Sequence, residues 1–202
     1  MTVIAAIKEN GKVYMGCDSI FMDLESYQTI KRTDSKLIQL DEIIIGITAT
    51  NGCRVFQIMK YLLKLPPTRK IKNDDLITYM TTTFRARVKK LLIAEDILLV
   101  DEDRKSNEPC IMPSEFLVAI RDRIFQVGQD FDIAEIDMPF STIGSGGEYA
   151  LGALETMSQF TTLPAEDKLL FAMKTSEKFT ASVKGPFHLL NTGEGSCLLE
   201  CF

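Results

Sequence analysis

The stretch TVIAAIKENG at residues 2–11 decides the fold of this chain. An apolar run leads into Asn10-Gly11, which supplies the positive φ angles that a type I′ hairpin turn needs. A second apolar run follows at residues 12–19. The sequence therefore predicts that the chain opens with an antiparallel hairpin of residues 2–8 and 12–19.

Further along the chain, short apolar runs alternate with longer stretches of helical period. Runs too short and too β-branched for helices predict strands at 36–40, 43–47, 115–120, 123–128, 140–143, 187–190 and 196–202. Apolar residues at helical spacing predict helices from 51 to the stop at Pro66, at 74–95, at 148–159 and after Pro164. Charge-rich residues 101–113 predict an exposed loop. This order predicts an α+β fold in which two antiparallel sheets stack face to face with helix pairs outside.

Composition excludes several classes of protein. The chain has 202 residues, of which 46% are hydrophobic, so we expect one core and a single domain of residues 1–202. A net charge of −5 argues against nucleic acid and anionic membranes as partners. There is no charged leader before an apolar segment, and no apolar stretch approaches the roughly twenty residues that span a bilayer. We therefore expect a cytoplasmic location.

The cysteines and the one histidine do not form a metal-binding pattern. An odd number of cysteines without small-domain spacing favours free thiols. A zinc site would need a second cysteine pair or more histidines than His188. We expect no metal and no cofactor, and we interpret Cys17 and Cys53 as buried packing residues. The cysteines are Cys17, Cys53, Cys110, Cys197 and Cys201.

Thr2 is a candidate nucleophile because it directly follows the initiator methionine. A threonine hydroxyl is a poor nucleophile at neutral pH and needs a neighbouring group to take its proton. If Met1 is removed, the α-amine of Thr2 lies within reach of its own hydroxyl and titrates near neutrality. An N-terminal threonine can then be both nucleophile and base.

Three further polar residues, Asp18, Lys36 and Ser145, stand where predicted strands end or turn. A lysine held by a carboxylate beside Thr2 would lower the pKa of the α-amine, because a second cation disfavours its protonation. We therefore expect Asp18 and Lys36 to pair next to Thr2.

Ser145 lies in the glycine-rich turn 144–147, ahead of a predicted helix. Backbone N–H groups at a helix start attract anions, which would suit a phosphate group. The turn lacks the phosphate-loop pattern Gly-x-x-x-x-Gly-Lys-Ser/Thr and the dinucleotide pattern Gly-x-Gly-x-x-Gly. It also lacks the Gly-x-Ser-x-Gly spacing of a nucleophile elbow. We interpret it as a tight strand-to-helix turn.

Taken together, these patches resemble the proteasome β-type and bacterial HslV peptidase family, in the family's order and near its spacing. The resemblance implies an N-terminal-nucleophile (Ntn) hydrolase fold, a four-layer α-β-β-α sandwich, and rings of subunits that enclose a proteolytic chamber. The patches are TVIAAIKENG at 2–11, GCDS at 16–19, KLIQL at 36–40 with Gly46, and IGSGGEYA at 143–150.

Residue by residue, the resemblance places Thr2 on the nucleophile and Lys36 on the catalytic lysine. It places Asp18 on the acid that holds this lysine and Ser145 on the serine that assists the N-terminal amine. The implied reaction is attack of the Thr2 hydroxyl on a peptide carbonyl, followed by hydrolysis of the acyl-enzyme ester.

Three positions depart from the family pattern. The family's Ala-Gly-Gly appears as Ala49-Thr50-Asn51, so the backbone N–H of Thr50 becomes the expected oxyanion donor. Glu177 and Thr180 are the nearest matches to a late-helix acid and hydroxyl, and a one-residue shift would select Lys178 and Ala181 instead. An ungapped alignment places Asp34 where the lysine belongs, whereas Lys36 fits the distance to Gly46 better.

The sequence thus predicts a threonine endopeptidase that cleaves peptides or unfolded proteins inside a ring-shaped homo-oligomer, which an unfoldase or activator could serve. A second hypothesis is a non-catalytic proteasome-like subunit that kept the fold and lost the chemistry. A third is a stand-alone hydrolase of small amides.

Overall fold

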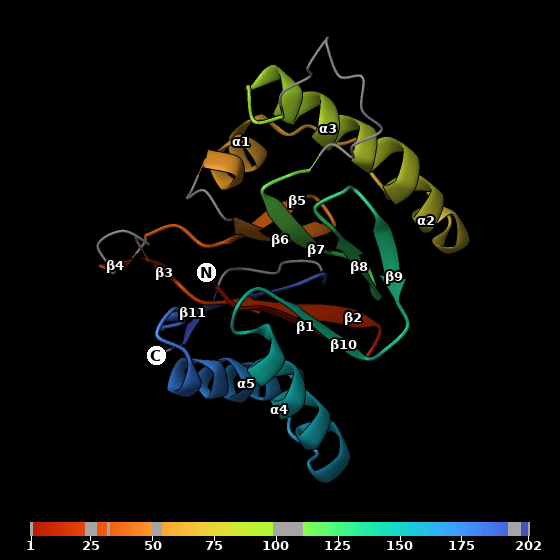
Figure 1. The fold of residues 1–202 in the computed structure, drawn as a ribbon. Coiled ribbons are helices and arrows are strands. Elements are labelled where there is room, and N and C mark those ends of the chain that lie inside the picture. Colours follow the sequence, from red (N-terminus) through yellow and green to blue (C-terminus); the bar gives the residue numbers. More distant parts are fainter. Residues whose placement is uncertain are drawn as a thin grey trace.

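The computed structural model describes residues 2–22, 28–31, 33–49, 54–98, 111–193 and 199–201. Two main antiparallel sheets dominate it (Figure 1). The first sheet has the strand order β10-β1-β2-β11-β12. Its strands are β1 (Ile4–Glu9), β2 (Lys12–Cys17), β10 (Phe140–Ile143), β11 (Phe187–Asn191) and β12 (Leu199–Cys201).

The second sheet runs in sequence order, β5-β6-β7-β8-β9. Beside these two sheets, β3 (Ile20–Met22) and β4 (Thr29–Lys31) form a separate two-stranded hairpin. The strands of the second sheet are β5 (Leu37–Leu40), β6 (Ile43–Ala49), β7 (Ser114–Ile120), β8 (Arg123–Val127) and β9 (Ile133–Ile136).

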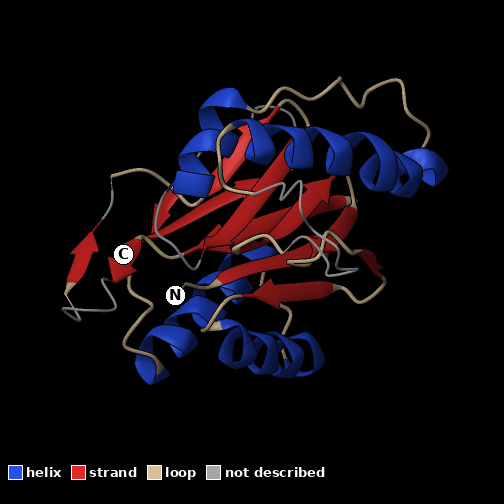
Figure 2. Ribbon diagram, turned by 45° about the horizontal axis from the view of Figure 1, so that its top comes forward, coloured by secondary structure: helices blue, strands red, loops and turns tan. Residues whose placement is uncertain are grey.

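Helices lie on the outer sides of the two sheets, as Figure 2 shows. Near the second sheet are α1 (Arg54–Leu62) and a longer helical segment made of η1 (Asn73–Asp75), α2 (Leu76–Tyr79), η2 (Met80–Phe84) and α3 (Arg85–Ala94). Near the first sheet are α4 (Gly147–Phe160) and α5 (Ala165–Phe179). None of the helices among the described residues is long and apolar enough to cross a membrane.

Three apolar clusters hold these elements together. One lies between the sheets, where Ile4 and Met15 of the first sheet meet Ile44 and Leu117 of the second. A second packs α4 and α5 against the first sheet, and a third packs α1 and the segment 76–94 against the second sheet. Burial of apolar surface at all three levels therefore fixes how the sheets face each other.

The opening hairpin is confirmed. Asn10 and Gly11 have φ angles of +53° and +71°, as a type I′ turn requires. The register pairs Ile4 with Cys17 and Glu9 with Lys12. This register brings the residue before β1 and the residue after β2 to the same end of the sheet.

Some elements differ from the predicted ones. The strands β3, β4 and β9 were not predicted. No residue of β4 or β9 is buried, and β3 has only three residues, which follow directly on the predicted strand 12–19. The predicted helix 74–95 contains the π-helical turn η2, in which the hydroxyls of Thr81 and Thr82 donate to the carbonyls of Ile77 and Thr78. Most of the predicted loop 101–113 lies outside the described residues, as does the predicted strand 196–202 apart from β12.

Candidate active site

Thr2 lies two residues before Ile4, the first residue of β1, which runs between β2 and β10 in the first sheet (Figure 1). The residue is 3% exposed. Its carbonyl oxygen accepts a hydrogen bond of 3.1 Å from the backbone N–H of Gly146, in the turn between β10 and α4. The backbone of Thr2 is therefore held by the same glycine-rich turn that contains Ser145.

Asp18 reaches Thr2 from the neighbouring strand, because it follows the last residue of β2 in the hairpin register. The side chain is fully buried. One carboxylate oxygen accepts the backbone N–H of Val3 at 3.1 Å, and the other accepts that of Ile20 at 3.3 Å. The Thr2 hydroxyl also donates to this carboxylate. These backbone donors orient a charge that burial alone would disfavour.

Lys36 comes from the other sheet, where it immediately precedes β5. Its Nζ lies 2.8 Å from each carboxylate oxygen of Asp18 and 2.7 Å from Thr2 Oγ1. The lysine side chain is only 12% exposed. The structure thus joins Thr2, Asp18 and Lys36, which are distant in sequence and come from both sheets, into one buried polar cluster.

This geometry can do specific chemistry. A lysine ammonium 2.7 Å from a hydroxyl oxygen stabilises negative charge that develops on that oxygen when it loses its proton. The Asp18 carboxylate compensates the charge of the ammonium, so the lysine can stay in a nearly dry site. The cluster therefore favours an activated Thr2 hydroxyl, provided that another group accepts the proton.

Ser145 lies beside the nitrogen of Thr2. The Thr2 N is 3.2 Å from Ser145 Oγ, and this hydroxyl is in turn 3.1 Å from the hydroxyl of Ser182. Ser145 is exposed, whereas Ser182 is buried. The three groups form a chain of hydrogen-bonding atoms that leads away from Thr2 and can carry a proton.

Two residues of this region were not predicted from the sequence. Ser182 follows α5, and the hydroxyl of the fully buried Ser176 on α5 donates to the carbonyl oxygen of Gly146 at 2.7 Å. Ser176 thereby fixes the turn that binds Thr2. The spacing of Ser176 to Leu169 and Met173 places it on the apolar face of the helix, which could have identified it as a buried polar residue. Ser182 lies on a loop, where no periodicity identifies buried positions.

No contact with the Thr2 site is recorded for Glu177 or Thr180, the predicted late-helix partners, among the described residues. Glu177 accepts the backbone N–H of Gly185 at 3.1 Å, and the buried hydroxyl of Thr180 has no hydrogen-bond partner among the described residues. Ser182, two residues beyond Thr180, contacts Ser145 instead.

The predicted lysine and oxyanion positions have different outcomes. Lys36 contacts the Thr2 hydroxyl at 2.7 Å, as expected from the alignment that places the catalytic lysine at position 36. Thr50, the expected oxyanion donor, lies outside the described residues, as does Cys53. Within the described ranges, no group of three His, Cys, Asp or Glu side chains lies close enough together to hold a metal ion.

Gly144 is required where the turn passes Thr2. Its φ is +91°, and a Cβ built on it would lie 2.4 Å from the carbonyl oxygen of Thr2. We expect Gly144→Ala to destabilise the fold by roughly 2–4 kcal/mol, from the strained backbone and the clash together. The matched control is Gly152→Ala in α4, where a Cβ meets nothing within 4 Å. This control should stabilise the fold by about 0.5–1 kcal/mol. Equal urea midpoints for the two variants would contradict this account of the turn.

Cys17, next to Asp18, is a packing residue. Burial raises the pKa of its thiol to about 11, although a hydrogen bond with Ser35 opposes the effect. We expect iodoacetamide to leave Cys17 unmodified at pH 8 in the native protein and to modify it in denaturant, as peptide mass mapping would show.

The raised pKa of Cys17 also predicts a pH dependence of stability. The thiol ionises at lower pH in the unfolded chain than in the folded one, so the free energy of unfolding should fall as pH rises from about 9 to about 11. The variant Cys17→Ala should show a smaller fall of the free energy of unfolding over this pH range. Rapid labelling of Cys17 in the native protein would contradict its assignment as a buried packing residue.

The structure has two stacked antiparallel sheets, with a threonine near the start of a central strand and a buried Asp–Lys pair beside it. We compared this chain with known proteins. No protein-family model matches the chain, and no curated protein matches it. Among solved structures, BPH from Thiobacillus denitrificans, a bacterial proteasome homologue, is 17% identical with a TM-score of 0.72. This match covers 94% of our chain and 96% of BPH.

Two further solved structures share the architecture. Eukaryotic HslV from Trypanosoma brucei is 14% identical with a TM-score of 0.62, over 94% of our chain and 98% of HslV. Anbu from Yersinia bercovieri, described as an ancestral β-subunit, is 13% identical with a TM-score of 0.65, over 98% and 86% of the two chains. The chain therefore has a proteasome β-type/HslV-like fold.

Proposed function

We propose that this protein is a threonine-type endopeptidase with Thr2 as its nucleophile. One observation carries the proposal: Thr2 Oγ1 lies 2.7 Å from Lys36 Nζ, while Asp18 holds the same Nζ at 2.8 Å. An ion pair that comes from two sheets and converges on one hydroxyl has no evident packing purpose, because apolar residues of similar volume would fill the space at lower cost.

The proposed reaction begins after removal of Met1, which frees the α-amine of Thr2. The amine takes the hydroxyl proton as Oγ1 attacks a peptide carbonyl carbon, and the lysine ammonium stabilises the charge on Oγ1. The tetrahedral intermediate collapses to an ester when the leaving amine takes the proton. Water then attacks the ester, a proton returns to Oγ1, and the acid product leaves. This reaction uses no cofactor.

The surrounding residues have supporting roles in this proposal. Ser145 and Ser182 orient the α-amine and offer a path for its proton, which their contacts at 3.2 and 3.1 Å support. The backbone N–H of Thr50 is the proposed donor to the oxyanion, a role that rests on the family resemblance.

We further infer that the layers form the four-layer α-β-β-α sandwich of Ntn hydrolases, as one domain over residues 1–202. By the same resemblance, copies of the chain would assemble into a cytoplasmic ring that encloses the Thr2 sites and admits peptides or unfolded proteins. One of the solved structures of similar fold is Thiobacillus denitrificans BPH in complex with epoxomicin, which supports the use of epoxyketones on this chain.

The sequence Ala49-Thr50-Asn51 favours a second candidate, a non-catalytic proteasome-like subunit. The family resemblance places position 50 at the oxyanion site, where a threonine side chain would narrow the approach to Thr2. In that case the Asp18–Lys36 pair would be a structural remnant.

A hydrolysis assay separates the two candidates. The purified protein, with Met1 shown to be absent by mass, is incubated with unfolded casein and with fluorogenic tetrapeptides, with and without epoxomicin. We expect peptide cleavage that epoxomicin stops. Absence of cleavage from protein with a free Thr2 amine would favour the non-catalytic subunit, and cleavage of small amides alone would favour a stand-alone amidase.

A further inference from the structure

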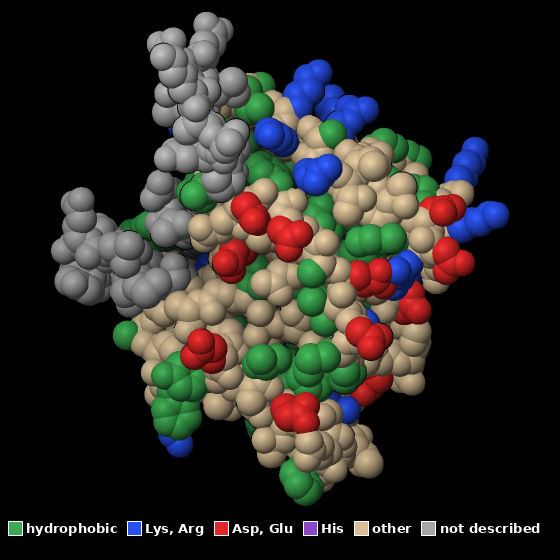
Figure 3. All heavy atoms as spheres, turned by 45° about the vertical axis from the view of Figure 1, so that its right-hand side comes forward, with side chains coloured by type: hydrophobic (Ala, Val, Ile, Leu, Met, Phe, Trp, Pro, Cys, Tyr) green, Lys and Arg blue, Asp and Glu red, His purple; other side chains and the backbone are tan. Residues whose placement is uncertain are grey.

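Positive charge is concentrated in one layer of the molecule. Residues 54–95, which include α1 to α3, contain ten Lys and Arg but three Asp and Glu, a net charge of +7. The remaining residues contain 13 basic and 25 acidic side chains, a net charge of −12. In Figure 3, Lys and Arg gather at the top of the molecule, where Figure 1 places α2 and α3. The charge of the whole chain therefore hides a cationic outer face.

A cavity opens within this cationic layer, between the end of α1 and α3. Its volume is about 260 Å³. Two leucines near the end of α1 and two apolar residues of α3 form the apolar part of its lining. Three basic side chains form the rest. The lining residues are Leu62, Leu63, Lys64, Arg87, Lys90, Leu91 and Ala94. The cavity thus combines an apolar surface with positive charge and no acidic residue.

The three cations of the cavity are not neutralised by the described residues. Lys64, Arg87 and Lys90 are exposed, and none of them forms an ion pair within the part of the chain that the structure describes. In contrast, Arg69 pairs with Asp41 at 2.8 Å. Among the described residues, the cationic charge at the cavity therefore has no acidic partner.

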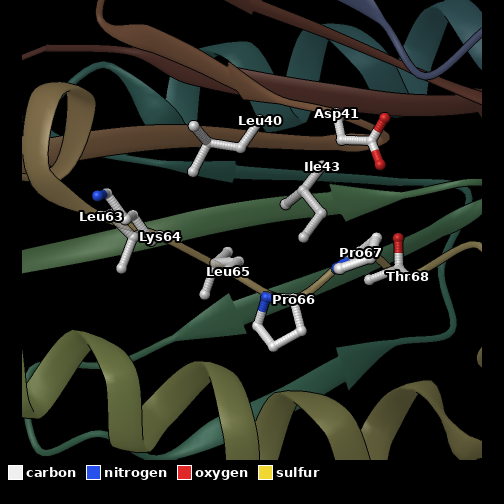
Figure 4. A pocket seen from close by; sticks show the side chains of 9 residues that line it. All are labelled: Leu40, Asp41, Ile43, Leu63, Lys64, Leu65, Pro66, Pro67 and Thr68. Atoms are coloured by element: carbon white, nitrogen blue, oxygen red, sulfur yellow. The ribbon is translucent and has the colours of Figure 1, made fainter.

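A neighbouring cavity of similar size differs in the charge of its lining. It has a volume of about 290 Å³, shares Leu63 and Lys64, and is lined otherwise by Leu40, Asp41, Ile43 and residues 65–68 (Figure 4). That cavity contains one cation and one acid, so its charge is balanced. Of these two cavities, the one between α1 and α3 is lined by cations without an acidic residue.

We propose that the cavity formed by Leu62, Leu63, Lys64, Arg87, Lys90, Leu91 and Ala94 docks an acidic peptide segment of a partner protein, with an apolar side chain inserted between Leu62 and Leu91. The volume is below that of pockets for drug-sized ligands, which favours a single inserted side chain over a whole small molecule. Carboxylates on either side of it would face the three cations. The surrounding positive layer would also steer an acidic partner to this face.

The test uses fluorescence anisotropy with a fluorescein-labelled peptide, Glu-Asp-Glu-Leu-Phe-Glu, and the full chain carrying Thr2→Ala. This background prevents hydrolysis, so the result does not depend on the proposed function. The test variant combines Arg87→Glu with Lys90→Glu. The matched control combines Lys70→Glu with Lys72→Glu, which changes the charge equally at exposed positions outside the cavity. Circular dichroism establishes that all proteins are folded.

We expect saturable binding that the test variant weakens at least about 10-fold and the control less than about 3-fold, since reversing a contacting charge replaces attraction with repulsion. The peptide Gln-Asn-Gln-Leu-Phe-Gln should bind at least about 10-fold more weakly, and 0.5 M NaCl should weaken the acidic peptide. Equal weakening by both variants, no binding at 1 mM peptide, or tighter binding of a single-stranded 20-mer oligonucleotide to the same residues would overturn the proposal.

Discussion

Replacement of Thr2 by alanine is expected to lower kcat for peptide hydrolysis by at least about 1,000-fold, because it removes the proposed nucleophile and leaves Lys36 facing no oxygen to activate. The fold should survive, since the change deletes a small polar side chain and the Asp18–Lys36 pair at 2.8 Å remains intact. The measurement is the initial rate on a fluorogenic peptide, with a thermal scan of the same sample.

The control for this prediction is Thr2→Ser. Serine keeps a hydroxyl at the same distance from the α-amine, so we expect this variant to retain hydrolysis and epoxyketone labelling. If Thr2→Ala and Thr2→Ser lost activity equally, the hydroxyl would not explain it. If Thr2→Ala kept the original rate, a contaminating peptidase or another nucleophile would be responsible.

The second large effect concerns the buried ion pair. Lys36→Met should abolish hydrolysis and destabilise the fold by about 3–5 kcal/mol, because it leaves the carboxylate of Asp18, which is 0% exposed, without its cation. For a chain of this length, such a loss lowers Tm by roughly 10 °C. Calorimetry and urea unfolding measure both effects.

Two further variants make this prediction specific. Adding Asp18→Asn to Lys36→Met should restore part of the stability but none of the activity, since it removes the unpaired buried charge while the amide oxygen can accept only one of the two backbone N–H groups. The matched surface pair is Arg69 and Asp41, also 2.8 Å apart but 71% and 41% exposed. The variants Arg69→Met and Asp41→Asn should each cost less than about 1 kcal/mol. Additive losses in the buried double variant would contradict this interpretation of the pair.

Much of the fold was predictable because local chemistry decided it. The Asn10-Gly11 turn fixed the opening hairpin, and the apolar stripe of residues 76–94 identified a long helical segment. Pro66 set a limit to the first helical region, although α1 ends four residues earlier, at Leu62. Two of the three missed strands, β4 and β9, have no buried residue, so no apolar face distinguished them from loops.

The site was predictable only in part, because it is built from contacts between distant elements. Asp18 and Lys36 stood out as polar residues at strand ends, and the resemblance supplied their pairing. Ser182 could not be found in this way, since its contact with Ser145 depends on the path of the loop after α5. The cationic layer was likewise not apparent from the net charge, because the excess of basic residues in 54–95 is outweighed by the excess of acidic residues in the rest of the chain.

The most direct test of the central claim is the intact mass of protein purified from cells, before and after incubation with an epoxyketone. This reagent requires both the hydroxyl and the free α-amine of an N-terminal threonine. We predict loss of the Met1 mass and a single adduct that maps to Thr2 and is absent from Thr2→Ala. A retained Met1 without any adduct, or an adduct that persists in Thr2→Ala, would contradict the claim that Thr2 is an activated nucleophile.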